Sequence, residues 1–165
     1  MSYCEKCGTL LVERFLENEG MIPYCEHCGQ YRFPMFNTAV SMVVYSPDHS
    51  KILLIQQYGK ARNILVAGYV NKGESAEEAV VREVKEETGL TVLDYRFNKS
   101  EYFAKSNTLM VNFACTVDSE NFTLRKGEVD RAGWFSVEEA RAQIYHDSLA
   151  EKFLLSAIEK RLYQA

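Results

Sequence analysis

The chain has 165 residues, of which 47% are hydrophobic and 25% are charged, and this average composition excludes a largely disordered or collagen-like protein. The length predicts one main domain with room for a small appendage. The 19 Lys and Arg residues against 23 Asp and Glu residues leave a net charge of −4, which opposes non-specific binding to nucleic acid or to an anionic membrane.

The N-terminal residues and the apolar runs favour a cytoplasmic protein. The longest apolar run is the seven residues 64–70, whereas a membrane-spanning helix needs about 20. The first residues lack the basic and apolar stretches of a secretory signal. We therefore expect a cytoplasmic protein without a membrane segment, and in that reducing compartment cysteines indicate metal binding before disulfides.

Four cysteines near the N-terminus form two pairs with the spacing of a structural zinc site. Cys4 and Cys7 form the first pair, Cys25 and Cys28 the second, and 17 residues separate the pairs. Each Cys-x-x-Cys turn directs two thiolates at one point. The alternative, four free cysteines, would leave residues 1–34 with little to fold around, because metal binding must supply their stability. We predict a zinc ribbon over residues 1–34.

Residues 35–165 have the composition of an ordinary α/β domain, and the change after Phe33-Pro34 predicts a domain boundary there. Ser-x-x-Glu capping boxes predict helices that begin at Ser75, Ser136 and Ser148, and Gly89 predicts the end of the first helix, 76–88. Runs of β-branched and aromatic residues between turn signals predict the strands. The expected strands are 38–45, 51–57, 64–70, 95–104, 109–117 and 133–135.

The helix expected over residues 76–88 carries three glutamates on one face. At about 100° per residue, Glu83, Glu86 and Glu87 cover an arc of about 100° that borders the apolar stripe. Like charges at this spacing destabilise a helix unless a cation lies among them. Ligands that are all oxygen select hard cations, so the pattern indicates Mg²⁺ or Mn²⁺. The alternative is an ordinary glutamate-rich surface helix.

The spacing around these glutamates matches a known signature. The fixed positions of the Nudix box, over 23 residues, are all occupied, by Gly68, Glu74, Arg82, Glu83, Val84, Glu86, Glu87, Gly89 and Leu90. The chain thus resembles the Nudix hydrolases. The resemblance implies an α/β/α sandwich with a mixed sheet, and hydrolysis of a nucleoside diphosphate linked to another group. It also implies four catalytic residues. Glu83, Glu86 and Glu87 would hold the cations, and Arg82 would orient these glutamates by ion pairing.

A zinc ribbon directly before such a domain resembles the NADH pyrophosphatase subfamily. Glu128 begins the segment Glu-Val-Asp-Arg-Ala-Gly-Trp-Phe, which is similar to a subfamily motif and makes Glu128 a further metal ligand. Ala67 is similar to the position that lends its backbone carbonyl to the metal. Residues 100–110 resemble the subfamily's substrate loop in length but lack its three prolines.

This resemblance and the side chains of the loop predict a set of substrate contacts. The resemblance implies that Phe33 and Tyr69 contact the substrate through their aromatic rings, and the alternative is that both rings simply pack in the core. The loss of the prolines puts a preference for NADH in doubt. The predicted substrate-binding residues are Phe33, Tyr69, Glu101, Tyr102, Phe103, Lys105, Thr108 and Ala150.

Three functions remain open at this point. The first is a Mg²⁺- or Mn²⁺-dependent pyrophosphatase for NAD(H) or a relative such as ADP-ribose. The second is a Nudix hydrolase for nucleoside triphosphates, sugar nucleotides or capped RNA ends, and only the last would bring in nucleic acid. The third is a non-catalytic binding or regulatory protein, although the intact box argues against it. We also expect a homodimer, because the short ribbon cannot fully bury residues such as Leu10, Leu11, Phe15 and Ile22, and related pyrophosphatases are dimers.

Overall fold

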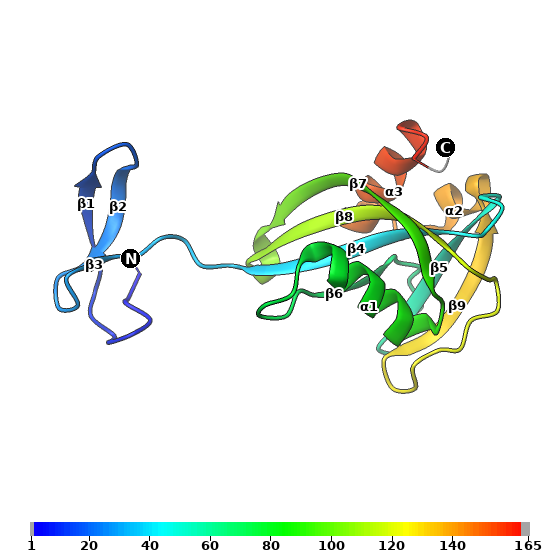
Figure 1. Ribbon diagram of the computed structural model, residues 1–165, viewed down its shortest axis with the longest axis horizontal. Helices are drawn as coiled ribbons and strands as arrows, with labels where there is room; N and C mark the ends of the chain where they lie inside the picture. Colours follow the sequence, from blue (N-terminus) through cyan, green and yellow to red (C-terminus); the bar gives the residue numbers. More distant parts are fainter. Residues whose placement is uncertain (1, 163–165) are drawn as a thin grey trace. The chain divides into compact units, whose positions relative to one another are not determined.

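The computed structural model describes residues 2–162, and the chain divides into two compact units, Met1–Phe36 and Asn37–Ala165 (Figure 1). The division falls two residues after the boundary expected between residues 34 and 35. Each unit contains its own sheet. Among residues 2–162, no helix is both long enough and apolar enough to cross a membrane.

Within residues 2–36, the N-terminal unit contains a three-stranded antiparallel sheet in the order β1-β2-β3. Its strands are β1 (Val12–Leu16), β2 (Gly20–Cys25) and β3 (Gln30–Tyr31). Gly8 and Gly29, each directly after a cysteine pair, have φ of 74° and 65°, which glycine adopts without strain. Their N–H groups donate to the carbonyls of Cys4 and Cys25 at 2.8 and 2.9 Å, so each turn closes on its own pair. The strands escape sequence analysis because their side chains do not alternate between buried and exposed positions, and only Cys25 among them is buried.

Within residues 37–162, the second unit is built on a six-stranded mixed sheet, with β7-β8-β4-β5-β9 side by side and β6 paired with β4. β4 and β8 run parallel, whereas the other paired strands are antiparallel. β4 therefore borders both β6 and β8 and brings these distant segments together. The strands are β4 (Asn37–Tyr45), β5 (Lys51–Gln57), β6 (Val66–Tyr69), β7 (Val92–Phe103), β8 (Thr108–Val117) and β9 (Val129–Ser136).

Helices cover both faces of this sheet. α1 (Ala76–Thr88) packs against one face, and α2 (Val137–Gln143) and α3 (Leu149–Glu159) pack against the other (Figure 1). β4 is buried on both sides, since Met42 and Val44 pack with α1 while Val43 and Tyr45 pack with α2 and α3. This α/β/α arrangement with a mixed sheet is the fold that the resemblance implies.

Local sequence signals predict α1 more accurately than they predict the strands. α1 spans the expected residues 76–88, with the expected capping box and C-terminal stop. β9 begins at Val129 rather than at residue 133, because its pairing with β5 continues as far as Gln57. In contrast, β6 begins at Val66 rather than at residue 64, since Ile64 forms only an isolated bridge. The remaining strand ends differ from the expected ones by three residues or fewer.

Candidate active site

β6, the loop after it and α1 follow one another in the chain and position the predicted metal ligands. The Ser75 side chain accepts from the Glu78 N–H, so the helix begins at a defined residue. Glu83 and Glu87 consequently point toward the sheet and are 7% and 1% exposed. The side chain of Glu86 is 41% exposed. The three carboxylates therefore border the core, as the helical spacing predicted.

Arg82 connects the loop with the helix. Its guanidinium donates to both carboxylate oxygens of Glu74 at 2.6 and 2.8 Å, to Glu83 Oε1 at 2.6 Å and to the Tyr69 carbonyl at 2.9 Å. The bidentate contact lowers the pKa of Glu74 to about 2. These contacts suit a residue that orients Glu83, which is the role that the resemblance implies for Arg82.

Glu87 is a buried carboxylate with an incomplete set of partners. Gln57 Nε2 donates to Glu87 Oε1 at 3.1 Å, whereas Oε2 has no hydrogen-bond partner among the described residues. The pairing of β5 with β9 shifts register between Gln56 and Gln57, and such irregularities re-aim side chains next to sites. Burial, and then repulsion by the neighbouring carboxylates, raises the pKa of Glu87 to about 8. A cation beside Oε2 would relieve both effects.

Gly68 leaves the space that the Glu83 carboxylate fills. A Cβ atom at this position would lie 2.0 Å from Glu83 Cδ, far closer than non-bonded atoms approach. The φ of Gly68 is not in the left-handed region, so the residue supplies space rather than backbone freedom. Ala67, whose carbonyl is expected to bind the metal, directly precedes it on β6.

The segment before β9 brings a fourth glutamate to the end of α1. Arg125 N donates to the Glu87 carbonyl at 3.1 Å, which anchors this segment on the last turn of the helix. Arg125 Nη1 then lies 3.0 Å from Glu86 Oε2 and 3.2 Å from Glu128 Oε2. The tertiary structure thus joins Glu128 to the glutamates of α1.

These four glutamates form a donor set for a hard cation. Carboxylate oxygens suit Mg²⁺ and Mn²⁺, and one buried oxygen, Glu87 Oε2, has no hydrogen-bond partner among the described residues. Arg82 and Arg125 lie among the carboxylates, which are not gathered around one point. Within residues 2–162, only the cysteine group brings three or more such ligand atoms within 4.8 Å of one another. The residue types and the unpartnered oxygen fit a divalent cation.

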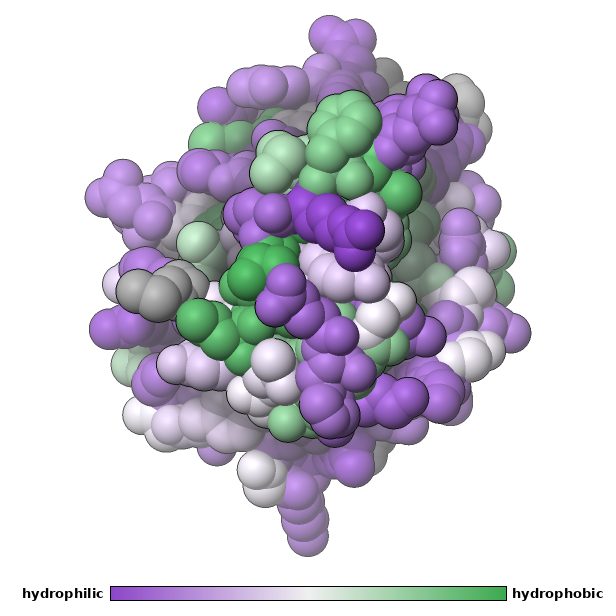
Figure 2. Space-filling model, turned by 90° about the vertical axis from the view of Figure 1, so that its left-hand side faces the viewer, coloured by the Kyte–Doolittle hydropathy of each residue, from purple (hydrophilic) through white to green (hydrophobic). Residues whose placement is uncertain are grey.

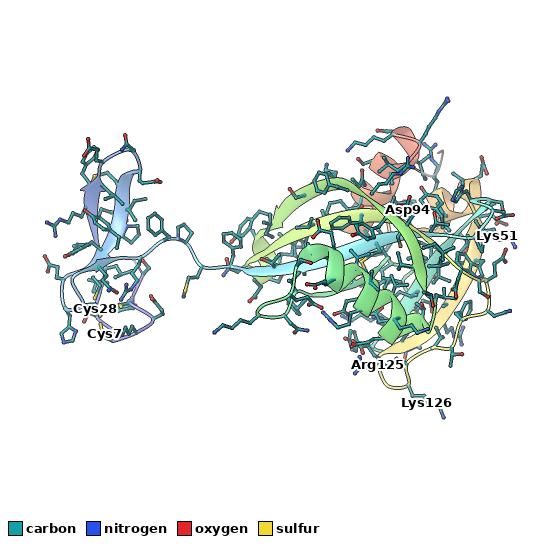
Figure 3. The ribbon with its side chains drawn as sticks, in the orientation of Figure 1. Cys7, Cys28, Lys51, Asp94, Arg125 and Lys126 are labelled. Carbon is teal, nitrogen blue, oxygen red and sulfur yellow. The ribbon has the colours of Figure 1, made fainter. Side chains whose placement is uncertain are left out.

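The Sγ atoms of the four N-terminal cysteines lie within 4.8 Å of one another and could bind one metal ion. Figure 3 labels two of them, Cys7 and Cys28. The Sγ atoms are 3.9 Å apart between Cys4 and Cys28, 3.5 Å between Cys7 and Cys25, and 3.4 Å between Cys7 and Cys28. A tetrahedron with metal–sulfur bonds of about 2.3 Å has edges of about 3.8 Å. A disulfide, in contrast, has a sulfur–sulfur distance of about 2.05 Å.

The acidities of these thiols also favour a cation. Burial acts to raise the pKa of Cys4, but hydrogen bonds from Arg32 and from backbone N–H groups outweigh it and bring the pKa to about 6. Hydrogen bonding with Cys7, followed by burial, raises the pKa of Cys28 to about 12. A metal ion bound by these cysteines would neutralise the charge of the thiolates that hold it.

Two of the predicted substrate residues, Tyr69 and Thr108, line one small cavity. β4 pairs with β6 and with β8, and this places the end of β6 near the start of β8. Sequence analysis did not predict Ala39, Ser106 and Met110 as part of this cavity, because only the sheet topology brings them together. The cavity has a volume of about 190 Å³ and is lined by Ala39, Ala67, Gly68, Tyr69, Ser106, Thr108 and Met110.

The other predicted substrate residues do not line this cavity. Glu101 pairs with Lys152 of α3 at 2.8 Å, and Tyr102 Oη donates to Asn107 Oδ1 at 2.6 Å. Three residues are placed by their elements alone: Phe103 ends β7, Lys105 lies in the short 3₁₀ helix Ala104–Ser106, and Ala150 lies in the first turn of α3. Phe33 is exposed in the N-terminal unit. Their roles in substrate binding stay predictions.

A wider groove of about 750 Å³ runs along the solvent side of α1. Lys72, Glu77, Val81, Lys85 and Tyr95 are among the residues that line it. The four glutamates of the candidate metal site are not among the described residues of its wall. Glu74 and Arg82 also line this groove, whereas Ala67 and Gly68 line the smaller cavity, so each of the two borders a different part of the candidate site.

Sequence analysis missed two further residues that contact the glutamates. Gln57 ends an expected strand, and nothing in its surroundings in the chain relates it to Glu87. Arg125 stands three residues before Glu128, which is a weak signal without the anchoring of its segment on α1. Both residues reach the site through tertiary contacts alone.

Comparison with known proteins agrees with this geometry. The sequence profile of the NUDIX domain matches residues 35–155. The chain belongs to the NUDIX family. It is 28% identical over 162 residues to the NAD-capped RNA hydrolase NudC of Haemophilus influenzae (strain PittGG), which covers 95% of this chain and 60% of that protein. It is 37% identical over 118 residues to the protein of the same name from Mycobacterium tuberculosis, covering 70% of this chain and 38% of that one.

Solved structures of NUDIX hydrolases have a similar fold. A NUDIX hydrolase from Nitrosomonas europaea matches 99% of this chain with a TM-score of 0.70 at 18% identity, and 93% of that chain is covered. A second structure of a NUDIX hydrolase from the same organism matches 76% of this chain, and 90% of that one, with a TM-score of 0.63 at 26% identity. This NUDIX protein spans between 38% and 60% of the length of the two curated relatives above.

Replacing Gly68 by Ala should weaken metal binding in this NUDIX domain without unfolding it. The added Cβ collides with the end of the flexible Glu83 side chain, so Glu83 must move while the backbone stays in place. We expect a folded protein by circular dichroism with at least about tenfold weaker Mn²⁺ binding in calorimetry. The matched control is Gly133→Ala in β9, whose Cβ would meet only the Phe135 ring. Unchanged Mn²⁺ affinity in Gly68→Ala would contradict the assignment of Glu83.

The raised pKa of Glu87 predicts how stability depends on pH when Mg²⁺ and Mn²⁺ are absent. The unfolded chain loses this proton near 4.5, whereas the folded protein keeps it to about 8. Stability should therefore fall as pH rises between these values, by up to about 1.4 kcal/mol per pH unit from this group. Urea unfolding followed by Trp134 fluorescence measures it. Glu87→Gln should lack this part of the pH dependence, whereas the exposed control Glu77→Gln should keep it. If the free energy of unfolding depends on pH in the same way in wild type and both variants, Glu87 is not the group responsible.

Proposed function

We propose that this NUDIX protein hydrolyses the diphosphate bond of a dinucleotide, NAD(H) or a relative such as ADP-ribose, and releases a nucleoside monophosphate. The observation that carries the proposal is the buried carboxylate of Glu87, whose Oε2 has no hydrogen-bond partner among residues 2–162, together with the neighbouring Glu83, Glu86 and Glu128. An acidic site accepts an anionic diphosphate only when divalent cations offset the charge of both. The two relatives named as NAD-capped RNA hydrolases favour a substrate of the NAD type.

The chain's own residues would hold the cation and orient its ligands. A bound Mg²⁺ or Mn²⁺ would supply charge neutralisation and a water acidic enough to attack phosphorus. Arg82 holds Glu83 in the space beside Gly68, and Gln57 holds Glu87 Oε1 so that Oε2 is left for the metal. The proposed ligands are Glu83, Glu86, Glu87, Glu128 and the Ala67 carbonyl.

The small cavity beside β6 suits one planar ring of the substrate. Tyr69 is 57% exposed and offers an aromatic face, while Met110 and Ala39 supply apolar contacts. A nicotinamide or an adenine in this cavity would lie next to Gly68, and its diphosphate would face the glutamates. Glu101, Tyr102, Phe103, Lys105 and Ala150 remain proposed contacts for the rest of the dinucleotide.

A capped RNA end is the second candidate substrate. The names of the curated relatives favour it, because the bond to be broken in an NAD cap is the same diphosphate. The net charge of −4 argues against strong binding of the RNA chain itself. We therefore rank the free dinucleotide first.

A substrate panel tests this function. NADH, NAD⁺, ADP-ribose and dGTP are each incubated with Mg²⁺ or Mn²⁺, and the products are identified by mass spectrometry. The first three should yield AMP, with kcat/KM values within about tenfold of one another, because the loop lacks the prolines that would hold it in one conformation. A preference for dGTP of more than tenfold would replace the proposal with hydrolysis of nucleoside triphosphates.

The same panel needs two variants to exclude a contaminating activity. Glu87→Gln keeps the size of the side chain but removes the charge, so turnover should fall by at least about a hundredfold. Glu77→Gln, on the solvent side of the same helix, should keep the wild-type rate. Equal loss in both variants, or none in Glu87→Gln, would remove the glutamates from the mechanism, and no hydrolysis by wild type would favour a non-catalytic binding protein.

We infer further that the cysteine group holds one structural Zn²⁺ and that the protein is a homodimer. Zinc follows from four thiolate ligands, which also call for a reducing compartment such as the cytoplasm. A dimer is favoured by exposed hydrophobic residues, Phe15 at 67% and Met21 at 58% among them. Figure 2 shows hydrophobic residues among hydrophilic ones on the face it presents.

Native mass spectrometry tests both inferences in one spectrum. We expect two chains of 18.9 kDa with one zinc ion per chain. Cys25→Ser should lose zinc and lower the melting temperature, because the metal supplies most of the stability of this unit. Cys115→Ala, in the core of the other unit, should keep the zinc. A zinc-free wild-type protein, or a monomer at micromolar concentration, would contradict the corresponding inference.

A further inference from the structure

Arg125 occupies an unusual position among the glutamates of the candidate metal site. One nitrogen, Nη1, contacts both Glu86 and Glu128, at 3.0 and 3.2 Å. Its backbone is held on both sides, since its N–H donates to the Glu87 carbonyl and its own carbonyl accepts from Val129 N at 3.2 Å. The side chain is nevertheless 51% exposed. The backbone of Arg125 is thus anchored at the site while its guanidinium has room to move.

Arg82, the other arginine of the site, differs from Arg125 in its exposure and in its partners. Arg82 is 25% exposed and donates to Glu74 and to the Tyr69 carbonyl, neither of which belongs to the proposed metal ligands. A cation at the proposed site would leave these two partners of Arg82 free of competition, although Arg82 also contacts the proposed ligand Glu83. Both side-chain contacts of Arg125, in contrast, are with proposed ligands. Arg125 and a divalent cation therefore compete for the same two carboxylates.

We propose that Arg125 neutralises Glu86 and Glu128 before the metal binds, and binds the phosphates of the substrate after the metal has displaced it. The second step rests on the function proposed above. Once displaced, the guanidinium stays near the site because its backbone is anchored on α1. The substrate diphosphate is then the anion within reach, and a guanidinium binds phosphate oxygens in a bidentate manner. Arg125 would thereby be a substrate-binding residue for the diphosphate.

The neighbouring residue supplies a matched control. Lys126 carries the same charge in the same segment before β9, as Figure 3 shows. Within residues 2–162, its side chain takes part in none of the hydrogen bonds or ion pairs of the site, whereas Arg125 takes part in two ion pairs. Lys126→Gln therefore measures the effect of a lost charge alone. Arg125→Gln measures that effect together with the loss of the two contacts.

Two measurements on the full chain test the proposal. Calorimetric titration with Mn²⁺, without substrate, should give about threefold to tenfold tighter binding in Arg125→Gln than in wild type, because the competing cation is gone. Lys126→Gln should stay within about twofold of wild type. With NADH and saturating Mn²⁺, kcat/KM should fall at least about tenfold in Arg125→Gln and little in Lys126→Gln.

The two halves of the proposal can fail separately. Mn²⁺ binding by Arg125→Gln that equals or is weaker than that of Lys126→Gln would overturn the competition. A kcat/KM in Arg125→Gln equal to that in Lys126→Gln, with an active wild type, would overturn the role in phosphate binding. Wild-type protein that hydrolyses none of the dinucleotides would instead refute the proposed function and with it the substrate role, while the calorimetry would still decide the competition.

Discussion

Electrostatic repulsion among four carboxylates at the end of α1 is the constraint on which the rest of the site depends. Glu83 and Glu87 are buried, so water does little to screen their charges. The protein meets this constraint in three ways. Arg82 pairs with Glu83, Arg125 pairs with the exposed Glu86, and the raised pKa of Glu87 keeps its proton in place without a metal. Each of these is a response that a divalent cation would make unnecessary, which is why the arrangement favours a metal site.

The N-terminal unit faces the same problem with a different ligand. Four thiols lie close together. Hydrogen bonding among them raises the pKa of Cys28, whereas the hydrogen bond from Arg32 lowers the pKa of Cys4. Sulfur ligands select a softer ion than carboxylates do, so the two units would hold different metals. In the second unit the core is large, and a metal would serve chemistry. In the first, few side chains are buried, and the metal would serve stability.

The sheet determines which parts of the chain can meet a substrate. β4 lies between β6 and β8, so Tyr69 and Thr108, distant in sequence, line one cavity next to Gly68. Glu101, in β7, is paired with Lys152 of α3 and lies outside this cavity. Under the proposed function, recognition of the ring and contact with the rest of the substrate would therefore depend on different elements.

The sequence alone determined the features that depend on local spacing. The Ser75 capping box and Gly89 predicted the two ends of α1, and helical periodicity predicted the shared face of its glutamates. The cysteine spacing predicted the metal-ligand group. Only the tertiary structure decided which residues surround them. Gln57 reaches Glu87 from the end of another strand, and Arg125 reaches Glu86 because its segment is anchored on the last turn of α1. Contacts between segments far apart in the chain leave no periodic signal, since they depend on sheet pairing and loop docking rather than on the repeat of a single element.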